Sequence, residues 1–187
     1  MKKRGRTMRK KTKRLVLSGL FLALGMVLPL LTGQIKEIGD SLLPMHLAVM
    51  LCGLICGYKY GLVVGLTLPF LRSLIFGMPP LYPNAIWMAL ELATYGLVIG
   101  LLYVKFKKKS TRYVYLSLII SMIAGRVVWG LAKAGLLGLM GKGVTLYALL
   151  VSGFVDAIPG IILQLLLIPT IMHLINRKQE DKKNEDS

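Results

Sequence analysis

The stretch from residue 44 to residue 95 is almost continuously apolar, yet polar side chains lie within it. His46, Arg72, Asn84 and Glu91 occur inside the apolar runs or at their edges. A soluble core does not need apolar helices this long, whereas a helix that crosses a bilayer needs about 20 apolar residues. The length of these runs therefore indicates a membrane protein, and the charges within them indicate a polar function inside the membrane.

The composition of the whole chain favours the same class. Of its 187 residues, 55% are hydrophobic, against roughly 45–50% in soluble domains. We expect an all-α integral membrane protein with six transmembrane helices in a single domain, residues 1–187. The domain has a basic tail at 1–14, a six-helix bundle at 15–175 and a charged tail at 176–187. The expected helices cover residues 15–32, 44–57, 60–76, 84–104, 113–139 and 146–175.

The distribution of Lys and Arg predicts the topology. In a six-helix chain both termini lie on one side, and nineteen Lys and Arg residues fall on that side, nine of them within residues 1–14. Only Lys36 and Lys142 fall on the other side. Because loops rich in Lys and Arg stay in the cytoplasm, we expect a multi-pass protein of the cell membrane with both termini cytoplasmic.

The net charge of +16 does not imply nucleic-acid binding. The basic run at 1–14 adjoins the first apolar helix directly, where Lys and Arg hold a terminus in the cytoplasm and contact anionic lipid. We therefore expect no nucleic-acid partner.

The sequence predicts neither a metal nor a cofactor, and it lacks enzyme motifs. Cys52 and Cys56 have neither zinc-site nor redox spacing, so we interpret them as small apolar packing residues. His46 is expected to be a loop-edge or core histidine, because no cluster of His, Asp and Glu surrounds it. There is no phosphate-binding Gly-rich loop, HExxH or GxSxG. We expect no catalytic residues, so ATP hydrolysis for any pumping must come from partner subunits.

Three expected helices each carry polar and aromatic side chains on one face, because these residues recur at helical spacing. They are Asn84, Trp87 and Glu91 (with Tyr95 following) on the fourth helix, Arg126, Trp129 and Lys133 on the fifth, and Asp156 and Gln164 on the sixth. Such faces can form a pocket for a small polar solute. The alternative is that Glu91 and Asp156 pair with the intramembrane Arg and Lys residues and only hold the bundle together.

Two expected outward loops and the first helix carry further signals. Three prolines stiffen residues 77–83, so Met78, Leu81 and Tyr82 are candidates for a lid over a cavity, although a plain connector is the alternative. In the first helix, Gly19 and Ala23 are small residues four apart, which lets another helix approach closely. That neighbour is either a helix of this chain or another subunit.

Taken together, the basic tail, the six helices, the Gly19/Ala23 pair and the run from PMHLAVMLCGLICGYKYG to WMALELATYG resemble a known family. This is the substrate-binding S component of energy-coupling factor (ECF) vitamin transporters, and the likeness is greatest to its pantothenate group. The resemblance covers residues 15–175. It implies capture of a vitamin from outside under a lid formed by 33–43 and 77–83. It also implies docking on a transmembrane coupling subunit with two ATPases, followed by toppling in the membrane to release the vitamin.

The resemblance also assigns roles to the polar faces. The family docks through an Ala-x3-Ala motif, in which Gly19 here replaces the first Ala. In the pocket, Arg126 or Lys133 would bind a carboxylate, polar side chains would bind hydroxyls and amides, and the tryptophans would wall the apolar part. Pantothenate matches this set. The alternatives are an S component for hydroxymethylpyrimidine, folate, cobalamin or riboflavin, a structural membrane protein without a ligand, or, least favoured, an intramembrane enzyme.

Overall fold

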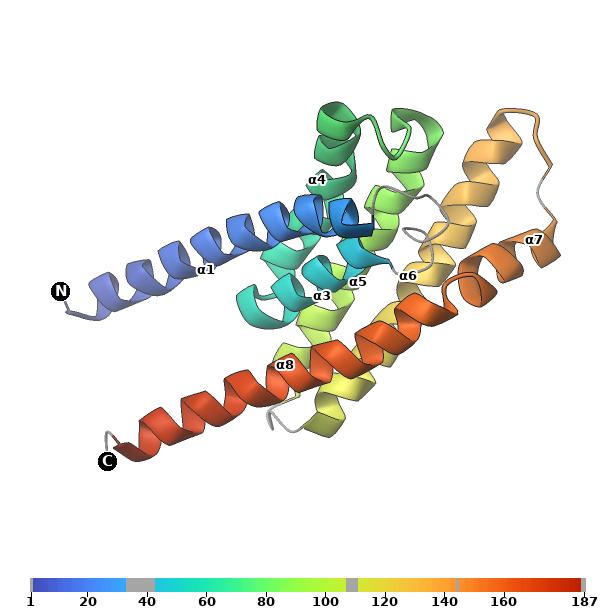
Figure 1. Cartoon of the computed structure of the whole chain (residues 1–187). Coiled ribbons are helices and arrows are strands. Elements are labelled where there is room, and N and C mark those ends of the chain that lie inside the picture. The colour runs from blue at the N-terminus through green and yellow to red at the C-terminus, as the bar shows by residue number, and fades with distance from the viewer. Residues whose placement is uncertain (1, 33–42, 107–110, 144, 186–187) are drawn as a thin grey trace.

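The computed structural model describes residues 2–32, 43–106, 111–143 and 145–185, which are helical almost throughout and contain no strand (Figure 1). The helices and short helical turns, in chain order, are α1 (Lys2–Val27), η1 (Leu28–Thr32), α3 (Pro44–Cys56), α4 (Tyr58–Phe76), η2 (Leu81–Ala85), α5 (Ile86–Lys105), α6 (Thr111–Leu139), α7 (Leu146–Leu150), η3 (Val151–Val155) and α8 (Ile158–Glu185). The prediction of an all-α protein is confirmed.

In the part of the chain that the structure describes, five helical segments are long and apolar enough to cross a membrane. They are Lys11–Leu30, Tyr58–Phe76, Leu81–Lys105, Thr111–Leu139 and Leu146–Lys178. The segment expected as the second span is α3, which has 13 residues, fewer than the roughly 20 that a perpendicular crossing needs. The number of six spans and the cytoplasmic location of both termini therefore stay predictions.

The ends of the chain differ from simple tails. Helix α1 extends over the basic segment up to Lys2, and α8 extends over the charged C-terminal segment as far as Glu185. Both helices project from the bundle, with the N and C ends on the same side of the view in Figure 1. The last expected span is interrupted, because a turn at 156–157 separates η3 from α8. Pro159 follows in the first turn of α8, where its missing N–H costs no hydrogen bond.

Helix α5 is the centre of the bundle and packs against α3, α4 and α6. Its contact with α4 brings the two backbones together through glycines. A Cβ atom added to Gly61 would lie 2.6 Å from the carbonyl oxygen of Gly96, and one added to Gly65 would lie 2.4 Å from that of Leu92. Because lipid provides no hydrophobic drive for helix association, small residues that permit such close approach hold membrane helices together.

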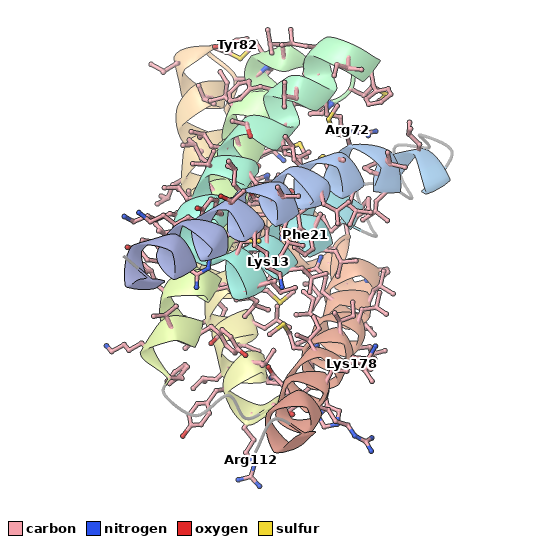
Figure 2. The ribbon with its side chains drawn as sticks, turned by 90° about the vertical axis from the view of Figure 1, so that its left-hand side faces the viewer. Lys13, Phe21, Arg72, Tyr82, Arg112 and Lys178 are labelled. Atoms are coloured by element: carbon pink, nitrogen blue, oxygen red, sulfur yellow. The ribbon has the colours of Figure 1, made fainter. Side chains whose placement is uncertain are left out.

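Helix α1 packs against α3 and α4, with Phe21 buried at this contact. Arg72 of α4 is buried and donates from Nη1 to the carbonyl oxygen of Met26, 2.8 Å away. Met26 lies in the last turn of α1, where carbonyls have no partner within the helix. Figure 2 shows Phe21 and Arg72 on this side of the bundle. Arg72 therefore closes the end of α1, which accounts for one of the charges expected inside the membrane.

Candidate functional site

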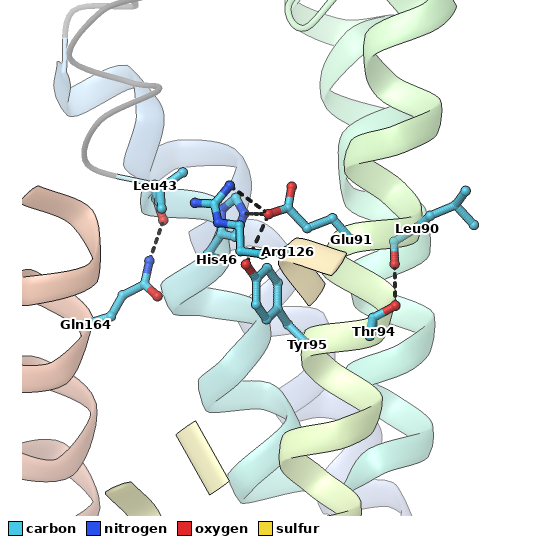
Figure 3. Close-up of polar contacts among 8 residues, drawn as sticks. All are labelled: Leu43, His46, Leu90, Glu91, Thr94, Tyr95, Arg126 and Gln164. Carbon is cyan, nitrogen blue, oxygen red and sulfur yellow. Dashed lines mark hydrogen bonds and ion pairs between the residues drawn. The ribbon is translucent and has the colours of Figure 1, made fainter. Parts of the chain in front are cut away.

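The carboxylate of Glu91 is the centre of a buried polar cluster. Its Oε1 atom lies 3.0 Å from Nη1 of Arg126 and 3.3 Å from Nε2 of His46. The hydroxyl of Tyr95 donates to the same oxygen over 3.1 Å. Glu91 is only 2% exposed, and the other three side chains are also buried. We refer to His46, Glu91, Tyr95 and Arg126 as the polar cluster; Figure 3 shows it between α3, α5 and α6.

Local sequence explains how three helices bring these groups together. Glu91 and Tyr95 are four residues apart on α5, so their side chains are neighbours on one face. Gly125 of α6 lies against the ring of Tyr95, and a Cβ atom there would be 2.6 Å from Cε1 of that ring. The glycine lets α6 approach, which places the next residue, Arg126, at Glu91. His46 lies in the first turn of α3 and meets the Tyr95 ring edge to face, with 5.2 Å between the ring centroids.

Two tryptophans and a lysine continue the polar cluster along α5 and α6. The guanidinium carbon of Arg126 is 5.9 Å from the ring centroid of Trp129. Nζ of Lys133 lies 4.5 Å from the ring centroid of Trp129 and 6.0 Å from that of Trp87. The same ammonium group donates to Oγ of Ser152 over 3.3 Å. Two cations thus lie against indole faces, which attract positive charge.

Several buried polar atoms near the polar cluster make no hydrogen bond within the described part of the chain. They are Nδ1 and Nε2 of His46, Nη2 of Arg126 and Oε1 of Gln164. His46 Nε2 is near Glu91, but the contact lacks hydrogen-bond geometry. Gln164 Nε2 donates to the carbonyl oxygen of Leu43 at 3.5 Å, three residues before His46 (Figure 3).

Such atoms are informative because a buried polar group without a partner costs about 1–3 kcal/mol. Native proteins keep few of them, and one explanation for a concentration of them is a site that a polar ligand completes. Here they come from α3, α6 and α8: those of His46 and Arg126 lie at the carboxylate of Glu91, and that of Gln164 lies beside the start of α3. Arg126 thus offers a hydrogen-bond donor beside Trp129, and Gln164 offers an acceptor near the start of α3.

The structure brings together five of the residues predicted to form the pocket: Trp87, Glu91, Arg126, Trp129 and Lys133. Gln164 is buried beside the start of α3. Asn84 is half-buried in η2, one turn before Trp87. Asp156 is exposed and joins none of these contacts. It lies in the turn at 156–157 that separates η3 from α8 within the segment Leu146–Lys178, so its expected place on one helix face with Gln164 stays a prediction.

Sequence reasoning did not select His46, Tyr95 or Ser152 as site residues. Tyr95 had a signal, since it follows Glu91 at helical spacing. His46 had only a weak one, as a lone polar residue near the start of an apolar helix. Ser152 had none, because it lies nineteen residues after Lys133 in the chain and on a different helical segment.

The residues predicted to form a lid are exposed at one end of the bundle. Met78, Leu81 and Tyr82 are all at the surface, and Figure 2 places Tyr82 at the end opposite Arg112 and Lys178. The other predicted lid segment, 33–43, lies outside the described residues except for Leu43. The lid function therefore stays a prediction. Among the described residues there is no group of three or more His, Cys, Asp and Glu that could hold a metal ion.

Comparison with protein-family models matches residues 13–172 to the family described as ECF transporter, substrate-specific component. The chain belongs to this family. Neither the search of curated proteins nor that of solved structures gave a match.

Membership of the ECF substrate-specific components settles the class of function. These proteins are multi-pass membrane subunits that bind a substrate for import, and they are not enzymes. Membership also implies a vitamin substrate and docking on a coupling and ATPase module. The expectation of an S component is confirmed, whereas the pantothenate group stays a prediction.

Proposed function

We propose that this S component captures pantothenate, or a vitamin with the same combination of carboxylate, amide and apolar groups, at the polar cluster. The observation that carries the proposal is a set of buried polar atoms on His46, Arg126 and Gln164 that make no hydrogen bond within the described residues, with Trp129 beside Arg126. Glu91 engages Nη1 of Arg126, and Nη2 makes no hydrogen bond to any described residue. A ligand carboxylate would bind there, in a charge-assisted contact.

The remaining groups match the other parts of the molecule. Gln164 Oε1 and the His46 ring would bind the amide and hydroxyls of pantothenate. Trp87 and Trp129 would wall its gem-dimethyl group, and Lys133, held against both indoles, would add positive charge on the carboxylate side. Asn84 and Asp156 lie outside the contacts of the polar cluster, so we do not propose that they contact the ligand directly.

The experiment is a tryptophan-fluorescence titration of the purified, ligand-depleted protein in detergent. Trp87 and Trp129 are the two tryptophans of the chain, so a saturable change reports on the proposed site. Pantothenate is compared with pantothenol, in which an alcohol replaces the carboxylate, and with a panel of other vitamins. We expect saturation by pantothenate and binding of pantothenol that is about tenfold to a hundredfold weaker, the value of a hydrogen bond to a charged group.

Variants then locate the carboxylate. Arg126→Lys should keep the protein folded but weaken pantothenate binding and reduce the preference over pantothenol, because Lys cannot bind both Glu91 and a carboxylate with a planar fork. Arg112→Lys, at an exposed position, is the matched control. Equal affinity of the wild type for pantothenate and pantothenol would contradict the proposed contact between Arg126 and the ligand carboxylate. Saturation by a different vitamin alone would show that this vitamin, and not pantothenate, is the substrate.

Delivery is proposed to use the outer face of α1. Gly19 and Ala23 are exposed there, and a Cβ atom at Gly19 would meet no atom within 4 Å. Gly19→Trp and Ala23→Trp should therefore leave binding intact and block uptake in cells that also produce the coupling subunit and ATPases. The control is Ile123→Trp on the exposed surface of α6. Normal uptake by both α1 variants would show that the docking face lies elsewhere.

A further inference from the structure

A cleft of about 610 Å³ lies at the far end of α5 from the polar cluster. It is bounded by the start of the apolar part of α1, the corner between α3 and α4, and the end of α5. Tyr103 lines it and follows Glu91 on the same helix by twelve residues, which is about 18 Å along the axis. The cleft is therefore distinct from the proposed vitamin site.

The walls of the cleft carry positive charge. Lys11, Arg14 and Lys59 line it, and none of its lining residues is acidic. Within the described residues, no ion pair joins these three cations to a carboxylate. Helix α4 begins in the cleft at Tyr58 without a side-chain cap, and the N-terminal end of a helix favours an anion. The cleft thus has the electrostatics of an anion site.

The same cleft has an apolar wall and lies at the border of the apolar spans. Its aliphatic and aromatic lining includes Leu54, Ile55, Val104, Tyr58, Tyr60 and Tyr103. One candidate span begins at Lys11 and another ends at Lys105, so the cleft lies where polar and apolar surroundings meet. Tyrosines are enriched at this depth in membrane proteins. An anion that carries an apolar chain fits both walls.

We propose that this cleft binds an anionic phospholipid. The phosphate of the head group contacts Lys11, Arg14 and Lys59, and the upper part of an acyl chain lies along the apolar wall. With the predicted topology the cleft faces the cytoplasmic leaflet, whose anionic lipids attract basic segments next to spans. Binding of the lipid needs no vitamin, so this inference does not depend on the proposed substrate.

The test compares two double variants that remove the same charge. The cleft variant, Arg14→Gln/Lys59→Gln, removes two of the basic side chains that line the cleft. The control variant, Arg112→Gln/Lys178→Gln, removes two exposed basic side chains elsewhere at that end of the bundle (Figure 2). Each protein, delipidated in detergent, is titrated with phosphatidylglycerol and with phosphatidylcholine of the same chains. Native mass spectrometry counts the lipid retained, and the thermal unfolding midpoint reports on stabilisation. Glycerol phosphate, the soluble anion, forms a third arm.

We expect the wild type and the control variant to retain one phosphatidylglycerol in preference to phosphatidylcholine. The cleft variant should bind phosphatidylglycerol about 30-fold more weakly, from roughly 1 kcal/mol per basic residue near an anionic surface, while its midpoint without lipid matches that of the control. Equal retention by the two variants would overturn the proposal. Stabilisation by glycerol phosphate equal to that by the lipid would also overturn it, in favour of a soluble phosphate ligand.

Discussion

Helix α5 has two faces that are built in opposite ways. Toward α4 it presents Gly96 and the backbone at Leu92, and the two helices meet backbone to backbone at Gly61 and Gly65. Toward α3 and α6 it presents Trp87, Glu91 and Tyr95, large side chains that fill the space between helices with polar and aromatic groups. The first face fixes the distance between α5 and α4. The second face carries the polar and aromatic side chains that lie between α5 and its other neighbours.

The difference shows how a small membrane protein can bury a charge. An unpaired charge in the membrane costs several kcal/mol, so Glu91 needs partners at fixed positions. The glycine contact between α4 and α5 supplies a rigid support in which only small displacements are possible. The polar face then requires a few well-placed side chains, and within the described residues it leaves atoms of His46 and Arg126 without a hydrogen bond.

The largest expected effect comes from removing the charge at the centre of the polar face. Glu91→Leu leaves Arg126 buried without its carboxylate partner, which should lower the free energy of unfolding by about 3–5 kcal/mol. The measurement is thermal or denaturant unfolding in detergent without ligand. The double variant Glu91→Leu/Arg126→Leu should recover most of this loss, because it removes both charges. An unchanged midpoint for Glu91→Leu would mean that the pair does not stabilise the fold.

A smaller loss is expected from the same face when only a hydrogen bond is removed. Tyr95→Phe deletes the hydroxyl that donates to Glu91 Oε1 and keeps the ring against Gly125. A hydrogen bond to a charged group contributes about 1.5–3 kcal/mol, so stability should fall by that order. Tyr115→Phe, at an exposed position, is the control and should be neutral. Equal midpoints for the two variants would contradict the contact.

The packed face is tested by adding a single methyl group. In Gly96→Ala the new Cβ would lie 2.3 Å from the carbonyl oxygen of Gly61, and such overpacking costs about 1–3 kcal/mol. Gly135→Ala on α6 is matched, since its Cβ would meet nothing within 4 Å, and it should be neutral or stabilising by up to about 1 kcal/mol. The unfolding midpoint of Gly96→Ala should therefore fall below that of Gly135→Ala. An equal shift in both variants would show that α4 and α5 are not in backbone contact.

The smallest effect is expected at the edge of the polar face. Ser152→Ala removes the hydroxyl that accepts from Lys133, at a cost of about 0.5–1.5 kcal/mol, while Lys133 keeps its contact with Trp129. Thr170→Ala is the comparison, because Thr170 also donates to the carbonyl four residues earlier but contacts no lysine within the described residues. The difference in unfolding midpoint between them isolates the lysine contact. If Thr170→Ala lowered the unfolding midpoint more than Ser152→Ala does, the contact between Lys133 and Ser152 would have no stabilising role.

Several features of the protein follow from the sequence alone. The apolar runs determine that it is helical and resides in a membrane, because a bilayer admits few other backbones. The helical period of 3.6 places Trp87, Glu91 and Tyr95 on one face of α5, and Arg126, Trp129 and Lys133 on one face of α6. The matching family also covers the bundle from residue 13 to residue 172, in agreement with the resemblance seen in its motifs.

Only the tertiary structure decided which charges meet. From the sequence, Arg72, Arg126 and Lys133 were equal candidates to pair with Glu91, yet Arg126 pairs with it, Arg72 closes the end of α1, and Lys133 contacts Ser152 and two indoles. The physical reason is that periodicity fixes neighbours within one helix, whereas neighbours between helices depend on how closely the backbones approach. Gly125 sets that approach between α6 and α5, and Gly53 and Gly96 set it between α3 and α5. The close contact of α3 with α5 brings His46 to Glu91, a pair that the sequence did not predict.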